Sequence, residues 1–573
     1  MPPTTNPTTA ELLAPALSPA RPALVRDGVE TTFVVPGDWP HSDLQRWLCP
    51  DARPATSDVA YLIDGPQTFQ SMVKALDTAS GQGSFIVLLG WSLDHAFVVD
   101  PERGRTFFDI VREKARLGVP VRVLLYYNTD MLVLFDEHGN PTDEAHRVNV
   151  NATAALNSLH LEEGLDVACR LDDNTSGFIP LGKVLIETFH PRRAGIHAYG
   201  SHHHKILLVQ GTEGLIGFCG GIDLDPNRCR ALHDVQLRLT GAAAVELLEI
   251  AEQRWSTSAH DEHPPTPPTL EVPPVKPASP AAPTPYVTQV VQTVGTPELR
   301  KRIPDTLWPA VRHAVRQAAR FIYIEDQYLM SLDLVAELVQ AADRLRHITV
   351  LVPAIAVTEP NTWNLRQQAL RELVRLGGPG IEEKIGLFQR ARGEHECIHS
   401  KLMVFDDEYA LIGTANANNR GYFLDSEVAI GVADRPLSDP RGPREGLWYH
   451  LEATFPRRLR IELWREHLGL PAAELFDGVG ARAHWDSPPP GAFIEPLRAI
   501  DIKTHKAAGR RYHEALTTWQ RRKEASEKLG APFHAPRPQD PIPPEDTALW
   551  WQAPYSDWAS FPTAEEQFVD PRQ

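Results

Sequence analysis

Residues 397–406 read CIHSKLMVFD, and residues 201–210 read SHHHKILLVQ. In both stretches a histidine and a lysine stand two residues apart and are followed by a short apolar run. The pairs are His203 with Lys205 and His399 with Lys401. In an extended strand, side chains two residues apart point to the same face. Because lysine is almost never buried without a partner, we expect an anion to lie over that face.

The sequence around these two stretches also repeats in the same order. Each half carries apolar, β-branched runs, then a histidine–lysine stretch, a glycine-bearing strand end and a closing helix. The repeated segments are 85–94 with 321–329, 121–128 with 348–355, 215–228 with 410–421, and 242–255 with 456–469. Alternating strands and helices predict α/β units, and the repetition predicts a duplication. We therefore expect a duplicated α-β-α fold: two mixed sheets flanked by helices, with an active site between the halves.

A proline-rich run at residues 263–285 divides the chain. Proline cannot continue a helix or a central strand, so the run predicts an extended linker. The segments that we expect are a Pro/Ala-rich leader with an N-terminal extension (1–56), an N-terminal half (57–262), the linker, a C-terminal half (286–474) and a C-terminal extension (475–573).

Composition narrows the class of protein. The net charge of the 573 residues is −17, which argues against a protein that coats nucleic acid. The five cysteines are scattered, so we expect reduced thiols rather than a disulfide framework. No run of about eighteen apolar residues and no Sec-type signal pattern is present. We expect a cytoplasmic protein, and export without a cleavable signal remains open.

A twofold-like arrangement of the halves would bring both histidines and both lysines to one cleft. The lysines would hold the oxygens of a phosphate as point charges. One histidine could attack phosphorus while the other protonates the leaving oxygen. A histidine pKa near neutrality suits both tasks, and such a pair needs no metal or other cofactor.

The motif H-x-K-x4-D, present twice in one chain, resembles the signature of the phospholipase D superfamily. The second copy is complete and ends at Asp406, whereas Gln210 stands at the matching position of the first copy. Other stretches that resemble motifs of this family are GGIDL at 220–224, HDV at 233–235, IEDQYL at 324–329, GTAN at 413–416 and LWREHLG at 463–469. The resemblance runs from Ser57 to Leu470, and it implies a duplicated phospholipase D-like fold.

This resemblance implies a phosphodiesterase that cleaves the head-group bond of glycerophospholipids through a phosphohistidine, with possible transfer to an alcohol. His203 would be the nucleophile, and His399 would be the general acid and then the base. The remaining implied roles are phosphate binding by Lys205, Lys401, Asn416 and Asn418, orientation of the histidines by Asp234 and Glu427, and structural roles for Gln210, Asp406, Gly221 and Gly413. Because glutamine keeps a hydrogen-bond acceptor, we expect Gln210 to be compatible with activity.

Five further side chains are candidates for substrate binding. Glu325 and Gln327 either line the pocket or act as buried polar partners. Trp91, like Tyr328 and Tyr422, either holds a quaternary ammonium head group by cation–π contact or packs in the core. Two pairs also resemble metal ligands, and we expect no metal at either: His202 with His204, and His395 with Cys397.

Other functions fit parts of the sequence. A nuclease of the same superfamily would use the same histidines, but such enzymes favour basic clefts. A cardiolipin-type synthase shares the motifs but usually carries N-terminal membrane helices. A non-catalytic lipid- or phosphate-binding protein would fit the altered first motif at Gln210. We expect a monomeric phospholipase that contacts a membrane surface transiently and binds no nucleic acid, and delivery as an exported toxin remains open.

Overall fold

The computed structural model of the chain describes residues 42–127, 144–173, 200–226, 232–258, 266–276 without 268, 286–354, 360–390, 397–434 and 454–500, with shorter pieces elsewhere. Most of the predicted leader and much of the predicted C-terminal extension lie outside the described residues, as does His395. Within the described part of the chain, no helix is both long enough and apolar enough to cross a bilayer.

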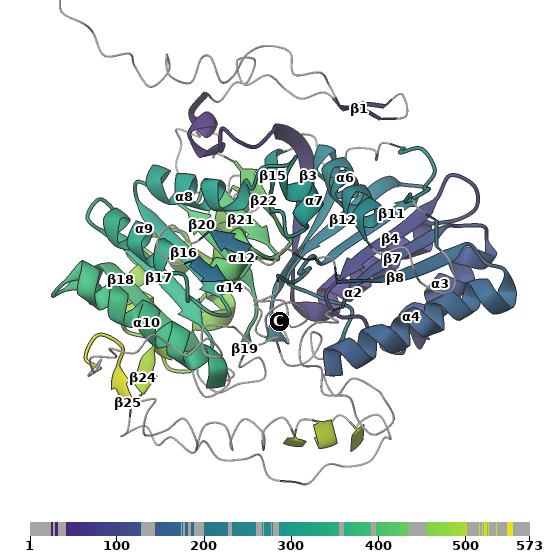
Figure 1. The fold of residues 1–573 in the computed structure, drawn as a ribbon. Helices are drawn as coiled ribbons and strands as arrows, with labels where there is room; N and C mark the ends of the chain where they lie inside the picture. The colour runs from purple at the N-terminus through teal and green to yellow at the C-terminus, as the bar shows by residue number, and fades with distance from the viewer. Residues whose placement is uncertain are drawn as a thin grey trace, which may run out of the picture.

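Within these residues, fifteen strands form one mixed sheet that runs through the molecule (Figure 1). From its centre outward, the N-terminal half supplies β3 (Pro54–Ile63), β14 (Val235–Gly241), β12 (Gly214–Gly220), β11 (Ile206–Gly211), β4 (Phe85–Gly90), β7 (Val121–Tyr126) and β8 (Val167–Asp172). The C-terminal half supplies β15 (Tyr286–Thr293), β22 (Glu427–Ala433), β21 (Tyr409–Gly413), β20 (Lys401–Phe405), β16 (Phe321–Asp326), β17 (His347–Val352) and β18 (Ile385–Arg390), and β23 (Ile494–Pro496) lies at the outer edge.

The matching strand order confirms the predicted duplicated α/β fold. The two predicted sheets are not separate, because β3 and β15 pair antiparallel at the centre and join them into one. The strands of the outer parallel part, such as β4, β7, β16 and β17, are buried along their whole length. Their apolar, β-branched sequences are typical of parallel strands that are covered on both faces.

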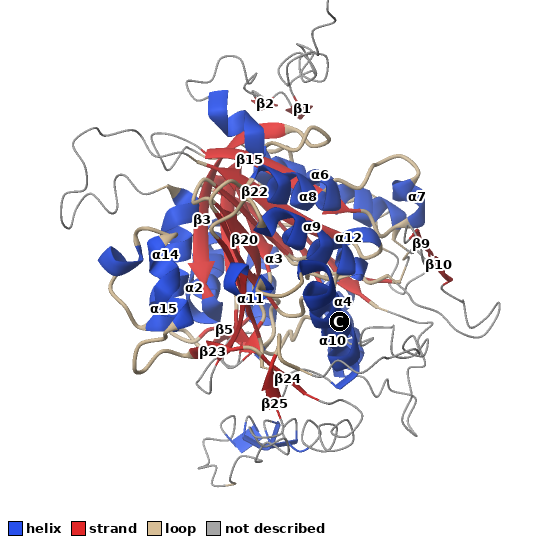
Figure 2. Ribbon diagram, turned by 90° about the vertical axis from the view of Figure 1, so that its left-hand side faces the viewer, coloured by secondary structure: helices blue, strands red, loops and turns tan. Residues whose placement is uncertain are grey.

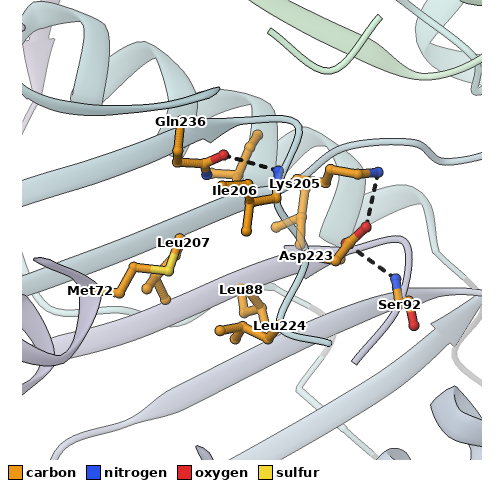
Figure 3. A pocket seen from close by; sticks show the side chains of 12 residues that line it. Met72, Leu88, Ser92, Lys205, Ile206, Leu207, Asp223, Leu224 and Gln236 are labelled. Carbon is orange, nitrogen blue, oxygen red and sulfur yellow. Dashed lines mark hydrogen bonds and ion pairs between the residues drawn. The ribbon is translucent and has the colours of Figure 1, made fainter. Parts of the chain in front are cut away.

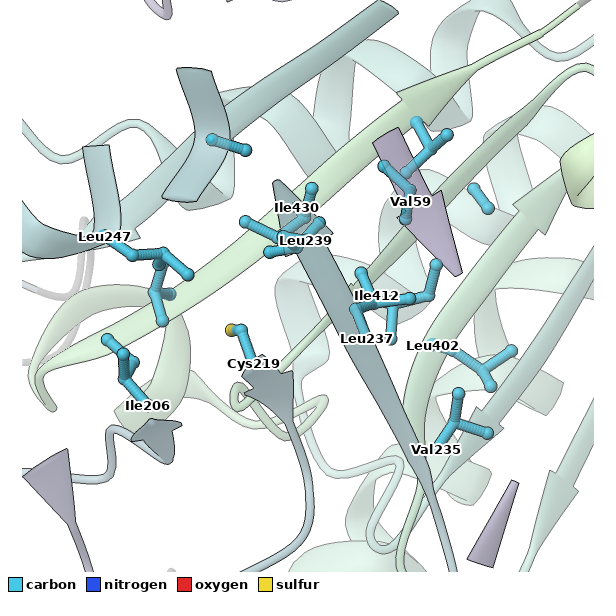
Figure 4. Close-up of a cluster of buried hydrophobic side chains, with 14 of the residues drawn as sticks. Val59, Ile206, Cys219, Val235, Leu237, Leu239, Leu247, Leu402, Ile412 and Ile430 are labelled. Carbon is cyan, nitrogen blue, oxygen red and sulfur yellow. The ribbon is translucent and has the colours of Figure 1, made fainter. Parts of the chain in front are cut away.

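Helices cover both faces of the sheet (Figure 2). The principal helices are α2 (Asp64–Thr78), α3 (Phe107–Arg116), α4 (Glu144–Glu163), α6 (Ala242–Thr257), α8 (Leu307–Gln317), α9 (Leu332–Ala342), α10 (Pro360–Gly377) and α14 (Phe455–Leu468). One buried cluster combines α6, α14 and strands of both halves, for example Leu237 and Leu239 with Ile412 and Ile430 (Figure 4). Because this core is continuous across the centre, neither half buries its apolar surface without the other.

The described residues of the predicted linker at 263–285 belong to no helix or strand, and they pack against the N-terminal half. Leu270 is buried, and its carbonyl oxygen accepts a hydrogen bond from Arg122 Nε at 3.1 Å. Arg170 Nε donates to Thr266 Oγ1 at 2.5 Å. Both arginines are themselves buried. The described part of the run is therefore a piece of the fold and not a free spacer.

The raised pKa of Glu246 on α6 provides a test of whether this side chain is buried in the folded protein. Its side chain is 8% exposed, and burial raises its pKa to about 8. Between the pKa of an unfolded glutamate and pH 8, the folded chain keeps a proton that the unfolded chain has lost, so stability falls as the pH rises through this window. Replacing Glu246 with glutamine removes this titration.

We expect E246Q to increase the free energy of unfolding at pH 8 by about 2–4 kcal/mol and to change it little near pH 4. Urea unfolding at the two pH values measures this difference. The neutral isostere leaves shape and volume almost unchanged, so an equal effect at both pH values would contradict the assigned protonation.

Candidate active site

Both histidine–lysine pairs lie at the beginning of equivalent strands. β11 begins directly after Lys205, and β20 begins at Lys401. Two strands away, Asp234 directly precedes β14 and Glu427 is the first residue of β22. β11 and β14 run in the same direction because each is antiparallel to β12 between them, and β20 and β22 are related in the same way through β21. All of these side chains therefore gather at one end of their strands.

The two histidines are held by carboxylates that come from the opposite halves. His203 Nδ1 lies 2.9 Å from Glu427 Oε1, and His399 Nδ1 lies 2.6 Å from Asp234 Oδ2. All four side chains are buried. A carboxylate at Nδ1 fixes the ring orientation and the tautomer, which directs Nε2 toward a substrate. Each half therefore supplies the carboxylate that holds the histidine of the other half.

Backbone hydrogen bonds also link each histidine to the opposite half. His203 N donates to the Ser426 carbonyl oxygen at 3.0 Å, and His399 N donates to the His233 carbonyl oxygen at 2.8 Å. The segments form parallel bridges at His202 with Ser426 and between β13 (Leu232–His233) and β19 (Cys397–Ile398). Each histidine is thus fixed to the opposite half by backbone as well as by side chain.

The electrostatics of Glu427 show that both lysines belong to the same site. Burial, together with the Asp425 carboxylate, raises the pKa of Glu427 well above its usual range. Thr414 and the two motif lysines, Lys205 and Lys401, act in the opposite direction. One carboxylate is therefore within electrostatic reach of a lysine from each half.

Each lysine Nζ donates to the carbonyl oxygen of its own motif histidine, and the other partners of the two lysines differ. Lys205 Nζ lies 3.1 Å from Asp223 Oδ2 and 5.6 Å from the centre of the Trp91 ring. Figure 3 shows this ion pair, with Asp223 also accepting a hydrogen bond from Ser92 N. Lys401 Nζ lies 3.5 Å from Gln327 Oε1. Asp223 was not among the predicted site residues, although it occupies the position in GGIDL that corresponds to Asn416 in the second half.

Two of the predicted binding residues present buried polar atoms. The Trp91 ring lies edge-on to His203 with ring centres 6.2 Å apart, and Asn416 is 3% exposed. Among the described residues, neither Trp91 Nε1 nor Asn416 Oδ1 has a hydrogen-bond partner. Buried polar groups are normally satisfied, so these atoms are suited to contact a ligand in the site.

Two other predicted binding residues have different positions. Asn418 Oδ1 accepts a hydrogen bond from Gly421 N at 2.6 Å and caps the helix α12 (Asn419–Phe423), and its expected role in phosphate binding stays a prediction. Glu325 is fully buried and its carboxylate contacts His233, Ser400 and His467, so it is a buried polar partner rather than a pocket residue. Tyr328 and Tyr422 are core residues at 1% exposure.

The two predicted structural glycines allow a close approach. A Cβ atom at Gly221 would lie 2.0 Å from Asp234 Oδ1. At Gly413 it would lie 2.2 Å from the carbonyl oxygen of Val428, which follows Glu427. Both contacts are too short for any side chain, so the glycine at 221 leaves room for the Asp234 carboxylate and the glycine at 413 leaves room for the backbone of β22.

The last residue of each motif forms hydrogen bonds with backbone groups and does not line the site. The Asp406 carboxylate accepts hydrogen bonds from the backbone N–H groups of residues 319–321. Gln210 Oε1 accepts from Lys276 N at 2.6 Å, and Gln210 Nε2 donates to the Pro274 carbonyl oxygen at 2.8 Å. An aspartate cannot donate, so glutamine suits a position where the proline-rich segment presents both kinds of backbone group.

The histidines that flank the first motif have protein partners. His202 Nδ1 lies 2.7 Å from Ser426 Oγ, and His204 Nδ1 lies 3.2 Å from Arg254 Nη1. Burial lowers the pKa of His204 well below its usual range. Both side chains therefore support the segment that carries His203.

The chain is similar in sequence to several known proteins. A sequence profile described as "Cardiolipin synthase, PLD-like domain" matches residues 311–440. Phospholipase D zeta 1 of Arabidopsis thaliana is 41% identical over 80 residues, which are 14% of this chain and 7% of that protein. Phospholipase D alpha 1 of Brassica oleracea var. capitata is 23% identical over 549 residues, covering 69% of this chain and 63% of that protein. A crystal structure of phosphatidylserine synthase from Haemophilus influenzae Rd KW20 aligns with a TM-score of 0.47 at 11% identity, covering 82% of this chain and 94% of that one.

The fold and the site together define a duplicated α/β protein with one histidine–lysine site built from both halves. The chain is similar to proteins of the phospholipase D superfamily, over residues 311–440 in the profile and over 69% of its length in the Brassica relative. The matched part spans 63% of the length of the Brassica relative and less of the Arabidopsis one.

Proposed function

We propose that the protein hydrolyses the head-group phosphodiester bond of glycerophospholipids through a phosphohistidine. The single observation that carries the proposal is the pair of crossed contacts, His203 with Glu427 and His399 with Asp234. Two oriented imidazoles with a lysine beside each suit in-line displacement at phosphorus. The names of the plant relatives favour a phospholipid as the phosphodiester.

In the first step, His203 Nε2 attacks phosphorus and the bond from phosphorus to the head-group oxygen breaks. His399 gives its Nε2 proton to the leaving alkoxide, and the head-group alcohol departs. In the second step, water attacks the phosphohistidine while His399 Nε2 takes a proton from it. The P–N bond breaks, phosphatidate leaves, and both histidines return to their starting states.

The contact of Glu427 with His203 supports the role of His203 as the nucleophile. Because Glu427 Oε1 lies 2.9 Å from Nδ1 of His203, it holds the ring in the tautomer that leaves Nε2 free to attack. Lys205, Lys401 and Asn416 would hold the phosphate oxygens, and Trp91 would line the site beside His203.

We expect the purified protein to release choline or ethanolamine from vesicles of phosphatidylcholine or phosphatidylethanolamine. EDTA is expected to leave the rate unchanged, because the described steps use side chains alone. Replacing Lys401 with methionine removes a phosphate-binding charge and is expected to lower the rate at least about a hundredfold.

Two outcomes would contradict this function. If the wild-type protein released no head group but nicked plasmid DNA, the substrate would be a nucleic acid. If K401M released head groups as fast as the wild type, the activity would not belong to this site.

Transfer of the phosphatidyl group is a second candidate, and the profile that matches residues 311–440 favours it by its description as a cardiolipin synthase domain. The same phosphohistidine can be attacked by an alcohol instead of water. Adding phosphatidylglycerol or ethanol to the vesicle assay distinguishes the two, since a transferase converts most of the intermediate to a new phosphodiester and a hydrolase converts it to phosphatidate.

A further inference from the structure

Three residues from separate sequence motifs meet directly behind the second catalytic histidine. They are His233 of HDV, Glu325 of IEDQYL and His467 of LWREHLG, and each is 0% exposed. None of them can contact a substrate. Their convergence therefore needs an explanation other than binding.

Glu325 is the centre of this cluster. Its Oε2 accepts a hydrogen bond from Ser400 Oγ at 2.6 Å and lies 3.2 Å from His233 Nε2. Its Oε1 lies 2.9 Å from His467 Nε2 and accepts a hydrogen bond from the Tyr323 hydroxyl. Four donors on one buried carboxylate hold it in one orientation.

The cluster is charged. Burial opposes charge on Glu325, but the charge of His233 and the hydrogen bonds from His233 and His467 outweigh it and hold the pKa of Glu325 well below its usual range. Burial lowers the pKa of His467, so His467 contributes as a hydrogen-bond donor. Burial also opposes charge on His233, yet Glu325, Asp64 and Glu466 raise the pKa of His233 well above its usual range. His233 Nδ1 lies 3.1 Å from Asp64 Oδ1 and 3.2 Å from Glu466 Oε1.

This charge state bears on whether the cluster holds a metal. His233, Glu325 and His467 have the spacing of a metal site, and so do Asp64, His233 and Glu466. A histidine that is protonated on both nitrogens donates twice and has no lone pair for a metal. Glu325 has hydrogen-bond partners at both of its oxygens, whereas His233 Nδ1 has charged neighbours but no hydrogen-bond partner among the described residues.

The position of Glu325 relative to the chemistry is specific. Ser400 directly follows the catalytic His399, and His233 directly precedes Asp234, its orienting carboxylate. The His233 carbonyl oxygen also accepts hydrogen bonds from the backbone of His399 and Ser400. One oxygen of Glu325 therefore joins the two backbone segments that carry the His399–Asp234 pair.

We propose that Glu325 is a positioning residue for the general acid, which fixes His399 against Asp234 by binding Ser400 and His233 with a single oxygen. The inference rests on the proposed function for the role of His399. It predicts that loss of the Oε2 contacts harms proton transfer to the leaving group, whereas loss of a contact to Oε1 does not.

The matched test compares two variants that each remove one hydroxyl from Glu325. S400A removes the contact to Oε2, and Y323F removes the contact to Oε1. The substrates are p-nitrophenyl and phenyl diesters of the same phosphate, because p-nitrophenolate leaves without protonation and phenolate leaves poorly. These diesters contain no lipid, so the test is independent of the head-group assay.

For the phenyl diester we expect S400A to lower kcat by about 10–100-fold, and for the p-nitrophenyl diester by no more than about threefold. Y323F is expected to stay within about twofold of the wild type on both. E325Q, which places an amide where four donors point, is expected to show the S400A pattern more strongly. Two results would overturn the proposal. One is a loss of kcat that is equal on both diesters and parallels a fall in melting temperature, and the other is an S400A variant with the wild-type kcat on the phenyl diester.

A wild-type protein that cleaves the diesters but releases no lipid head group would refute the proposed lipid substrate. The comparison of S400A with Y323F on the diesters would still decide the role of Glu325. The substitution of Tyr323 also controls for stability, since it lies in the same buried cluster. A Y323F loss as large and as leaving-group-dependent as that of S400A would refute the distinction between the two oxygens.

Discussion

Replacing His399 with asparagine is expected to lower phospholipid turnover by at least about ten-thousandfold, because the head-group alkoxide then leaves without a proton. With a p-nitrophenyl diester the leaving group needs no proton, so the first step should survive in H399N. The second step still lacks its base. We therefore expect a burst of p-nitrophenolate followed by slow release. The phosphoryl group should remain on His203, where mass spectrometry of peptides prepared without acid treatment would detect it.

The matched variant H203N is expected to give no burst with either substrate, because it has no nucleophile. His202 is the control, since it is buried beside His203 but contacts Ser426 instead of a catalytic carboxylate. H202N should retain the burst. A burst in H203N, or an adduct on a residue other than His203, would show that the assignment of the two histidines is wrong.

The pattern of strands and the two H-x-K motifs were sufficient to predict the duplicated fold and a site between the halves. Apolar, β-branched runs of strand length are a local signal, and their repetition in order is a global one. The sequence could not show that the sheets join. That depends on β3 and β15, whose edges meet only once both halves are folded.

The contacts of individual side chains were predicted less well, for reasons that differ between residues. Glu325 lies on β16, which is buried along its length, and a strand buried on both faces has no alternation to show which face a side chain occupies. Asn418 had a local signal, since asparagine before a short helix is a preferred cap. The proline-rich run was predicted to be extended, but its packing depends on Arg122 and Arg170, which are far away in sequence.

The sequence also could not show which carboxylate pairs with which histidine. Asp234 follows His203 and Glu427 follows His399 at similar spacings, so a pairing within each half fits the sequence equally well. The exchange is fixed by backbone contacts between segments more than 150 residues apart, His203 with Ser426 and His399 with His233. Only a variant that separates the two steps of the reaction can distinguish the pairings in solution.

Replacing Asp234 or Glu427 by its amide is expected to cost about ten-thousandfold in phospholipid turnover, because an amide favours the wrong tautomer of its histidine. The p-nitrophenyl diester separates the two variants. Since Asp234 holds His399, D234N should resemble H399N, with a burst and a stalled phosphohistidine. Since Glu427 holds His203, E427Q should resemble H203N, with no burst.

Pairing within each half predicts the opposite result, so the experiment has a clear alternative outcome. If Asp234 supported His203, D234N would abolish the burst and E427Q would retain it. Glu246 supplies the control for the chemical change, because E246Q is also a buried carboxyl-to-amide substitution and lies on α6, outside the catalytic pairs. E246Q should keep the wild-type rate on both substrates, and a reversed burst pattern in the other two variants would refute the exchange between halves.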